Sequence, residues 1–262
     1  MAYNKVYITS FSPTRNTMRM AFSVAKGLGF TNTPTVVLHN TEQRIRGRYN
    51  ELGANEILIA GCPSYYGRLP MVNPPVFGNI VGNNTTAIIF VTYGNIDYED
   101  SLIEMRDLLK GKGFNCIAAG AFVTGYAHSN KIGLGRPNDK DYEMAIELGK
   151  MARQKIDNNS LSDNIDIKGN NPYKEFPMPE EFSPVANDTC VHCNLCSRLC
   201  PVNAINEFNP KITEEYICIH CHGCVTKCPM EAREVIDKGF FEKVNMLDEK
   251  FQGNNLESEI FY

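Results

Sequence analysis

Two stretches of this sequence repeat one cysteine-rich unit. Residues 190–201 read CVHCNLCSRLCP and residues 218–229 read CIHCHGCVTKCP, so each unit has cysteines at i, i+3 and i+6 and ends in Cys-Pro. These units hold eight of the ten cysteines in the 262 residues. A secreted disulfide framework would come in a short chain behind a signal peptide, whereas this chain begins MAYNKVYITSFSP, with no basic stretch before an apolar core. Cysteines this crowded in an intracellular chain indicate metal, and we expect a cytoplasmic protein.

The spacing inside each unit favours iron–sulfur clusters. Three thiolates at i, i+3 and i+6 can wrap one cube, and the fourth cannot easily close the same cube and ligates the other cluster. The predicted ligands are Cys190, Cys193, Cys196 and Cys228 for cluster I, and Cys218, Cys221, Cys224 and Cys200 for cluster II. Cys-x2-Cys is also zinc spacing, but zinc takes four ligands at a site and has no use for two three-cysteine runs that each precede Cys-Pro.

The two units resemble the bacterial two-cluster ferredoxins over about 50 residues. That resemblance implies two 4Fe-4S clusters that pass single electrons. Three histidines, His192, His220 and His222, lie inside the units. Because eight cysteines suffice for two clusters, we expect exposed loop histidines; the alternative is that they donate N–H groups to cluster sulfur.

The first 160 residues alternate apolar runs with helical patterns. Five runs rich in Ile, Val and Ala predict buried strands at 5–9, 35–38, 56–61, 86–94 and 115–125. Helical patterns follow at 16–28, 98–110 and 139–156. This alternation predicts an α/β fold, a doubly wound five-stranded parallel sheet covered on both faces, with its ligand at the carboxyl ends of the strands.

Three of the predicted strands run into polar or aromatic loops. Residues 10–17 (SFSPTRNT) put hydroxyl and amide side chains at a helix start, which makes a cradle for a phosphate monoester. An ordinary capped helix is the alternative. The other two loops are 61–70 (GCPSYYGRLP) and 92–98 (TYGNIDY). Because these strand ends meet at one edge of the sheet, the arrangement suits a flat aromatic ring with a phosphate tail.

Together the three loops resemble those of flavodoxins, over about 155 residues. The resemblance implies flavin mononucleotide (FMN), and the absence of G-x-G-x-x-G after a strand disfavours a dinucleotide fold of the NAD type. Pro13 and Arg15 replace residues that are often Thr or Gly, so Arg15 either pairs with the phosphate or blocks the backbone approach. The implied cofactor-binding residues are Ser12, Thr14, Arg15, Asn16, Thr17, Ser64, Tyr65, Tyr66, Gly67, Arg68, Thr92, Tyr93, Gly94, Asn95 and Tyr98.

The resemblance also implies roles for these residues. Tyr65 or Tyr66 would cover one face of the flavin ring and Tyr98 the other. Backbone around Gly67 would face the flavin N5, and residues 92–95 the pyrimidine edge. The alternative is that the tyrosines only rim a small apolar cleft. His128 is a candidate for the flavin edge, although a surface loop histidine is the simpler interpretation.

Both modules in one chain resemble the flavodoxin–ferredoxin fusion family of anaerobic bacteria and archaea. We expect a flavodoxin-like FMN-binding domain at 1–160, a linker at 161–186, a two-cluster ferredoxin domain at 187–240 and a tail at 241–262. The linker is rich in Asn, Asp, Ser and Pro, and the tail is expected to form a short helix or to pack on a domain.

Charge divides the chain in the same way. Residues 1–160 carry 17 basic and 13 acidic side chains, a net +4, and residues 161–262 carry 9 and 17, a net −8. The halves should therefore attract each other, within one chain or between two, and this docking should weaken with salt. No strongly basic face for nucleic acid and no apolar run of about 18 residues for a membrane span is present.

These features predict an electron carrier that passes low-potential electrons between the two clusters and FMN, to or from a redox protein. An FMN-dependent reductase of a quinone, nitro compound or similar small acceptor is the alternative. We assign no catalytic residue, because no paired acid and base is evident, and this favours the carrier. A second alternative is a ferredoxin whose flavodoxin-like domain binds no flavin and only docks.

Overall fold

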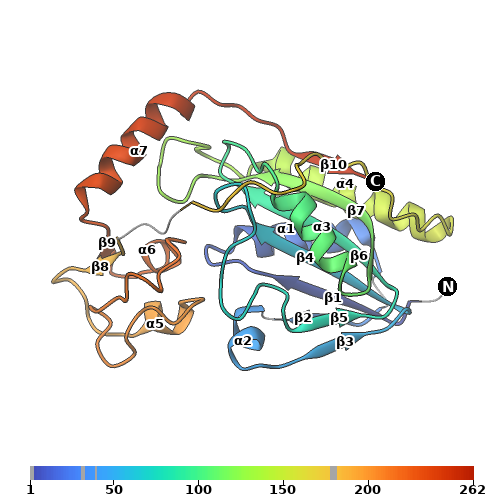
Figure 1. The fold of residues 1–262 in the computed structure, drawn as a ribbon, viewed down its shortest axis with the longest axis horizontal. Helices are drawn as coiled ribbons and strands as arrows, with labels where there is room; N and C mark the ends of the chain where they lie inside the picture. Colours follow the sequence, from blue (N-terminus) through green and yellow to red (C-terminus); the bar gives the residue numbers. More distant parts are fainter. Residues whose placement is uncertain (1–2, 31–32, 39, 178–181) are drawn as a thin grey trace.

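The computed structural model describes residues 3–30, 33–38, 40–177 and 182–262. Its main element is a six-stranded sheet in the order β10-β7-β6-β4-β1-β2 (Figure 1). Five strands are parallel and fall on the predicted runs: β1 (Lys5–Ser10), β2 (Thr35–Leu38), β4 (Glu56–Pro63), β6 (Thr85–Tyr93) and β7 (Phe114–Val123). Taken in chain order these five stand 2-1-3-4-5, the doubly wound order of flavodoxins. The predicted fold class is confirmed.

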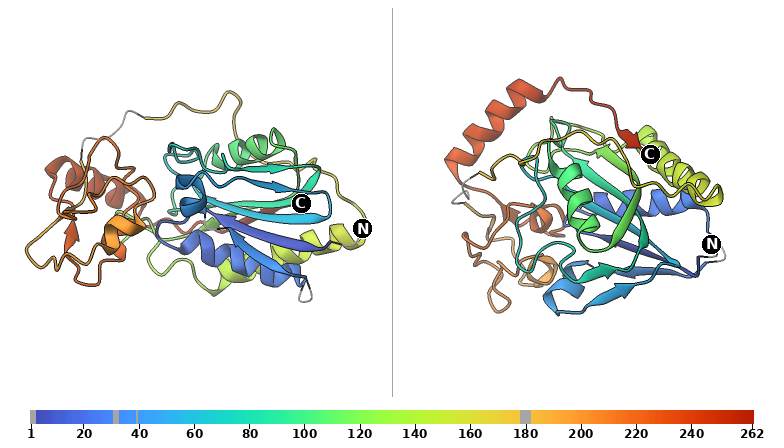
Figure 2. Two further views of the ribbon diagram at one scale, coloured as in Figure 1. Left: turned by 90° about the horizontal axis from the view of Figure 1, so that it is seen from below. Right: turned by 45° about the vertical axis from the view of Figure 1, so that its right-hand side comes forward.

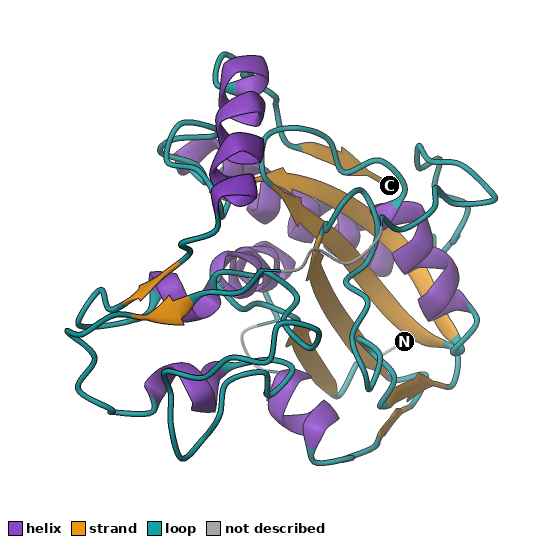
Figure 3. Ribbon diagram, turned by 60° about the vertical axis from the view of Figure 1, so that its left-hand side comes forward, coloured by secondary structure: helices purple, strands orange, loops and turns teal. Residues whose placement is uncertain are grey.

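Helices cover both faces of this sheet (Figure 3). Successive strand residues point to opposite faces, so Ile57 and Ile59 pack on one side while Leu58 and Ala60 pack on the other. The first side is covered by α1 (Asn16–Leu28) and α4 (Asp139–Asp157), and the second by α3 (Ser101–Lys110). All three helices fall on the predicted helical patterns. A two-stranded sheet of β3 (Asn50–Leu52) and β5 (Ile80–Gly82) extends the second side, and α2 (Asn40–Ile45) follows β2.

Helices α1 and α4 pack in backbone contact. A Cβ atom added to Gly27 would lie 1.8 Å from the Ile146 carbonyl oxygen, and one added to Gly149 would lie 2.1 Å from that of Val24. Only glycine allows this approach, which holds α1, and the loop before it, in place on the sheet.

The cysteine-bearing segment lies beyond the carboxyl ends of the parallel strands (Figure 2). It contains a two-stranded ribbon of β8 (Val185–Ala186) and β9 (Arg233–Glu234), with the short helices α5 (Leu195–Leu199) and α6 (Gly223–Thr226), one in each cysteine unit. None of the helices in the described residues has both the length and the hydropathy of a membrane span.

The end of the chain returns to the sheet. Helix α7 (Lys238–Phe251) leads away from the cysteine-bearing segment, and β10 (Glu259–Phe261) pairs antiparallel with β7 (Figure 1). The main sheet therefore has six strands rather than the predicted five. The sequence pattern did not reveal β10 because three residues are too short for a periodic signal.

The segment predicted as a linker packs on the sheet domain. Ile165 and Ile167 are buried in the core on the α3 side. The Asp100 carboxylate accepts hydrogen bonds from the backbone N–H groups of Asn170, at 2.8 Å, and Lys174, at 2.7 Å. These contacts explain how residues without regular secondary structure keep a defined path.

Candidate functional site at the carboxyl edge of the sheet

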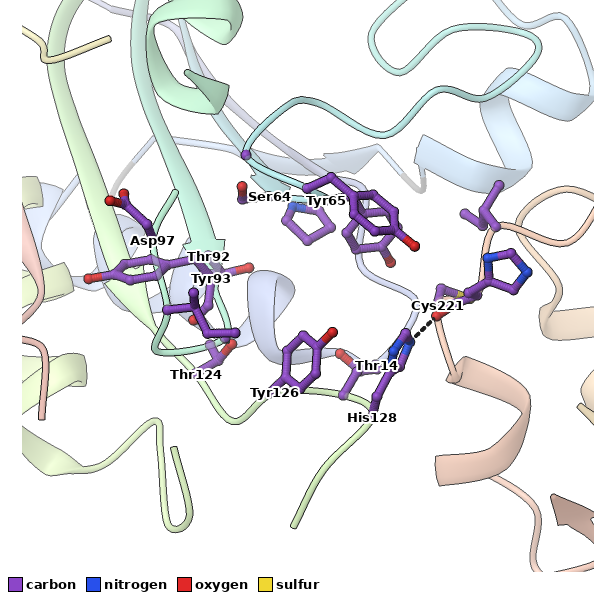
Figure 4. A pocket seen from close by; sticks show the side chains of 18 of the residues that line it. Thr14, Ser64, Tyr65, Thr92, Tyr93, Asp97, Thr124, Tyr126, His128 and Cys221 are labelled. Atoms are coloured by element: carbon purple, nitrogen blue, oxygen red, sulfur yellow. Dashed lines mark hydrogen bonds between the residues drawn. The ribbon is translucent and has the colours of Figure 1, made fainter. Parts of the chain in front are cut away.

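The carboxyl ends of the parallel strands open into a cavity of about 470 Å³, called here the sheet-edge cavity. Thr14, Ser64, Thr92 and Thr124 line it from the ends of β1, β4, β6 and β7 (Figure 4). Its volume is within the range of about 300–1,000 Å³ that is usual for small-molecule sites. Ten of the predicted cofactor-binding residues line it: Thr14, Asn16, Thr17, Ser64, Tyr65, Tyr66, Gly67, Thr92, Tyr93 and Gly94.

The start of α1 forms the polar end of this cavity. No acidic residue occupies the first turn of the helix, so the positive end of its dipole is not neutralised there. The Thr17 hydroxyl lies 2.8 Å from that of Thr92, which joins the loop to β6. These groups fit the phosphate of a mononucleotide.

Two members of the predicted phosphate loop do not line the cavity. The Ser12 hydroxyl instead accepts a hydrogen bond from the Met18 backbone N–H at 3.0 Å and so caps the helix. Arg15 adopts a left-handed backbone conformation with φ of 73° and is exposed. The position that is often glycine in flavodoxins therefore keeps the backbone conformation that glycine favours, although it carries an arginine side chain.

Three tyrosines supply the aromatic walls. Tyr65 and Tyr126 lie on opposite sides of the cavity (Figure 4). Tyr66 packs edge-on against Phe176, with ring centroids 5.6 Å apart. Burial raises the pKa of Tyr66 to about 12, and the nearby Tyr126 phenol adds to this shift. A flat ring between these phenols would have an apolar surround.

Three predicted residues have structural roles outside the cavity. Tyr98 is buried, and its hydroxyl donates to Glu259 of β10 at 2.5 Å. Burial first, and then this hydrogen bond, raise the pKa of Tyr98. Asn95 binds the tail through Asn254 and Leu256. Arg68 forms two hydrogen bonds with Glu104, at 2.8 and 2.9 Å. Tyr98 is thus not among the residues that line this cavity, whereas Tyr126 is.

The second cysteine unit forms one wall of the cavity. Ile219, His220 and Cys221 all line it. Tyr65 stands next to this wall: its pKa is raised by burial first, and then by the nearby thiols of Cys221, Cys62 and Cys218. The predicted ligands of cluster II therefore lie beside the residues predicted to hold the flavin.

A group of aromatic and histidine rings joins this unit to the sheet domain. The His128 ring packs at a tilt against that of His222, with centroids 4.2 Å apart, and its Nε2–H donates to the His220 carbonyl at 2.6 Å. Phe182 stacks on His220, and Phe240 of α7 contacts His128 and His222. Burial lowers the pKa of His128 to about 4, so this ring is neutral at ordinary pH. Of the three histidines expected to be exposed, only His192 is.

The cysteines of the repeat lie in two neighbouring sets. Cys190, Cys193, Cys196 and Cys228 line one small cavity of about 20 Å³. Burial raises the pKa of Cys221 to about 12, and the neighbouring thiols of Cys224, Cys200 and Cys218 add to it. Cys200 thus crosses to the thiols of the second unit, and Cys228 to those of the first. Among the described His, Cys, Asp and Glu side chains, no three or more converge to hold a single metal ion.

Several residues at the cavity come from parts of the chain that the sequence did not connect with it. Lys174, Glu175 and Pro177 come from the predicted linker, and Lys243 and Leu247 come from α7. Lys243 lies 5.3 Å from the centroid of the Tyr66 ring. Tyr126 lies in the loop that follows β7, just as the other lining loops follow their strands. Its position after the fifth strand could therefore have predicted its place at the cavity.

Comparisons with known proteins cover both parts of the chain. A family model described as a 4Fe-4S binding domain matches residues 184–206, which include the first cysteine unit. A search of the curated proteins finds no match.

Solved structures similar to the first part include two flavodoxins. One, from the domain Archaea, is 16% identical with a TM-score of 0.39, and the match covers 58% of this chain and 99% of that one. The other, from Megasphaera elsdenii, is 16% identical with a TM-score of 0.37, covering 57% and 98%. Rubredoxin:oxygen oxidoreductase from Desulfovibrio gigas is 17% identical with a TM-score of 0.39, covering 60% of this chain and 37% of that one. The strand order of the sheet assigns the fold, and the family match assigns residues 184–206, which hold the first cysteine unit. The chain therefore joins a doubly wound, flavodoxin-like sheet to a 4Fe-4S binding segment.

Proposed function

We propose that this protein is an electron carrier in which FMN occupies the sheet-edge cavity and two 4Fe-4S clusters occupy the cysteine units. The observation that carries the proposal is that one cavity is lined both by the loop at the start of α1 and by Cys221, a predicted cluster ligand. FMN exchanges one or two electrons and each cluster exchanges one, so the two kinds of cofactor together can connect one-electron and two-electron partners.

The chain's own residues bind and orient the cofactors in this proposal. Thr14, Asn16 and Thr17 hold the phosphate at the helix start, and Tyr65, Tyr66 and Tyr126 enclose the ring. Lys174 from the linker and Lys243 from α7 also line the cavity, so both segments would lie beside the ring. The low dielectric of a partly buried site strengthens the influence of such charges on the cofactor.

The test is anoxic purification with iron, sulfide and flavin counted on the same sample, followed by a reductive titration. We expect about eight irons and about one FMN per chain, with flavin and clusters reduced in the same titration. About eight irons without flavin would contradict the proposal and leave a ferredoxin with a docking domain.

One observation favours the reductase as a second candidate. The cavity is lined by linker and α7 residues as well as by the predicted flavin-binding loops, and a small acceptor could bind between them, beside the ring. Steady-state oxidation of the reduced protein by a panel of quinones and nitro compounds separates the two functions. Saturation kinetics would support the reductase, whereas second-order oxidation without saturation would support the carrier.

A further inference from the structure

The two cysteine units have the same local backbone but different surroundings. Each residue of the first unit matches the residue 28 positions later. At the third position His192 and His220 both have φ of 53°, and at the fifth Asn194 and His222 have φ of 58° and 53°. Because the local backbone is shared, a difference in burial between two matched side chains reflects the different surroundings of the two units.

At five consecutive matched positions the second unit is the more buried. Val191 is 59% exposed whereas Ile219 lines the sheet-edge cavity, and His192 is exposed whereas His220 is 8% exposed. The pairs Cys193 and Cys221, Asn194 and His222, and Leu195 and Gly223 differ in the same direction. Within the described chain, three residues of the second unit and none of the first line the cavity.

Gly223 shows how close the second unit comes. A Cβ atom added there would lie 3.0 Å from the Pro13 carbonyl oxygen and 3.2 Å from the Pro13 Cβ, so the start of α6 packs on the loop before α1. The matched residue in the first unit is Leu195, a side chain that this contact has no room for. His128 reinforces the contact by donating to the His220 carbonyl at 2.6 Å.

From these contacts we infer that the two halves of the repeat have different tasks: the second unit is the fixed internal contact with the flavin site, and the first unit is the outward end that exchanges electrons with the redox partner. This inference rests on the proposed function and adds the order in which the redox centres lie between the partner and the flavin. Each exchange moves one electron, oxidising one centre and reducing its neighbour, with the external partner as source or sink.

An electron-spin-resonance-monitored redox titration tests the order on the full chain, with FMN bound and after its removal. Removing FMN changes the surroundings of Cys221 but not those of Cys193, so we expect one cluster potential to shift and the other to stay. The matched variants Cys221→Ser and Cys193→Ser identify the signals, since each alters the cluster that it ligates. The inference would be overturned if the cluster whose potential shifts on removal of FMN were the one whose signal is altered by Cys193→Ser.

A second test needs no bound flavin. Gly223→Leu gives the second unit the side chain of the first, and Leu195→Gly is the reciprocal control. We expect Gly223→Leu to speed amide hydrogen exchange in residues 12–19 and 126–129 by about tenfold, with Leu195→Gly leaving those amides unchanged. Equal effects of the two variants, or no effect of Gly223→Leu, would contradict the internal contact. Failure of the proposed function would appear separately, as missing flavin or iron in the cofactor count.

Discussion

Thr14 and Asn16 stand where the helix dipole of α1 and the loop from β1 meet. Both line the cavity and Arg15 does not, so substitutions can distinguish the residues that bind the phosphate from those that do not. We expect Thr14→Ala and Asn16→Ala each to weaken FMN binding about tenfold, the cost of one hydrogen bond to a charged group. We expect Arg15→Ala, like its exposed neighbour Arg19→Ala, to change affinity less than about threefold.

The measurement is a fluorescence titration of the flavin-free protein with FMN. If Arg15→Ala weakened binding as much as Asn16→Ala did, the arginine would be a phosphate ligand in spite of its exposed position.

Asp100 is the carboxylate on which the linker depends. It is fully buried, and burial on its own raises its pKa, but hydrogen bonds from Lys174 and Asn170 and the charge of Arg68 outweigh this and lower the pKa below its usual value. A lowered pKa means that the ionised form stabilises the fold. This contribution is complete above the unfolded pKa of about 3.9 and is lost as the pH falls through the folded value.

We therefore expect Asp100→Asn to lower the free energy of unfolding by about 2 kcal/mol at neutral pH, and by less at acid pH, where the wild type has lost the same contribution. Urea denaturation at several pH values measures this. Glu147→Gln, which removes a carboxylate from an exposed pair with Lys150, is the control and should have almost no effect. A pH-independent loss for Asp100→Asn would show that charge has no part in holding the linker.

At the scale of elements, the last ten residues complete the sheet. Besides pairing with β7, the tail places the Ser258 hydroxyl 2.6 Å from a buried oxygen of Asp141, which also binds Arg136. The Tyr93 hydroxyl donates to the Glu257 carbonyl at 3.2 Å. Without the tail, β7 becomes an unpaired edge of apolar residues next to a buried carboxylate.

Ending the chain after Phe251 should therefore reduce stability by several kcal/mol, about the sum of a lost charged hydrogen bond and a lost strand, and should promote aggregation. Thermal denaturation and light scattering would show both effects. Removing only Tyr262, which is 59% exposed, is the control. An unchanged melting temperature after the longer truncation would mean that β10 adds nothing to the sheet.

At the scale of the whole molecule, the charge difference between residues 1–160 and 161–262 predicts a salt-sensitive interface. Three ion pairs join these halves through the linker and α7: Lys110–Asp163, Lys131–Asp248 and Glu99–Lys174. In the described part of the chain, however, no ion pair joins residues 3–160 to the cysteine-bearing residues 187–236. The sheet domain meets the second cysteine unit through the ring contact of His128 with His222, the His128 hydrogen bond and the packing of Gly223 on Pro13. Such contacts are screened little by salt.

We therefore expect small-angle X-ray scattering to give the same radius of gyration at about 0.05 M and about 1 M salt, over which the Debye length shrinks several-fold. A radius that grew at high salt would restore the electrostatic docking expected from the net charges. His128→Ala is the positive control. It removes the ring contacts and the hydrogen bond together, so it should weaken the contact between the sheet domain and the second cysteine unit and increase the radius of gyration.

Local patterns in the sequence were sufficient for the framework of this protein. The five parallel strands and α1, α3 and α4 lie where apolar periodicity placed them, because a buried strand or an amphipathic helix is specified by residues within one window. The spacing of the cysteines likewise predicts two ligand groups, since three of the four ligands in each group are neighbours in sequence. The loops at the strand ends were found because parallel strands bring their carboxyl ends to one edge.

Tertiary structure decided which of those loop residues face the cavity. Tyr98 and Tyr126 follow neighbouring strands, yet Tyr98 turns inward because its hydroxyl meets Glu259, 161 residues away. The burial of His220 and His222, the linker and α7 residues at the cavity, and the sixth strand likewise depend on contacts between distant segments. Two units with the same cysteine spacing thus have different environments, because burial depends on what folds against a segment as well as on the segment itself.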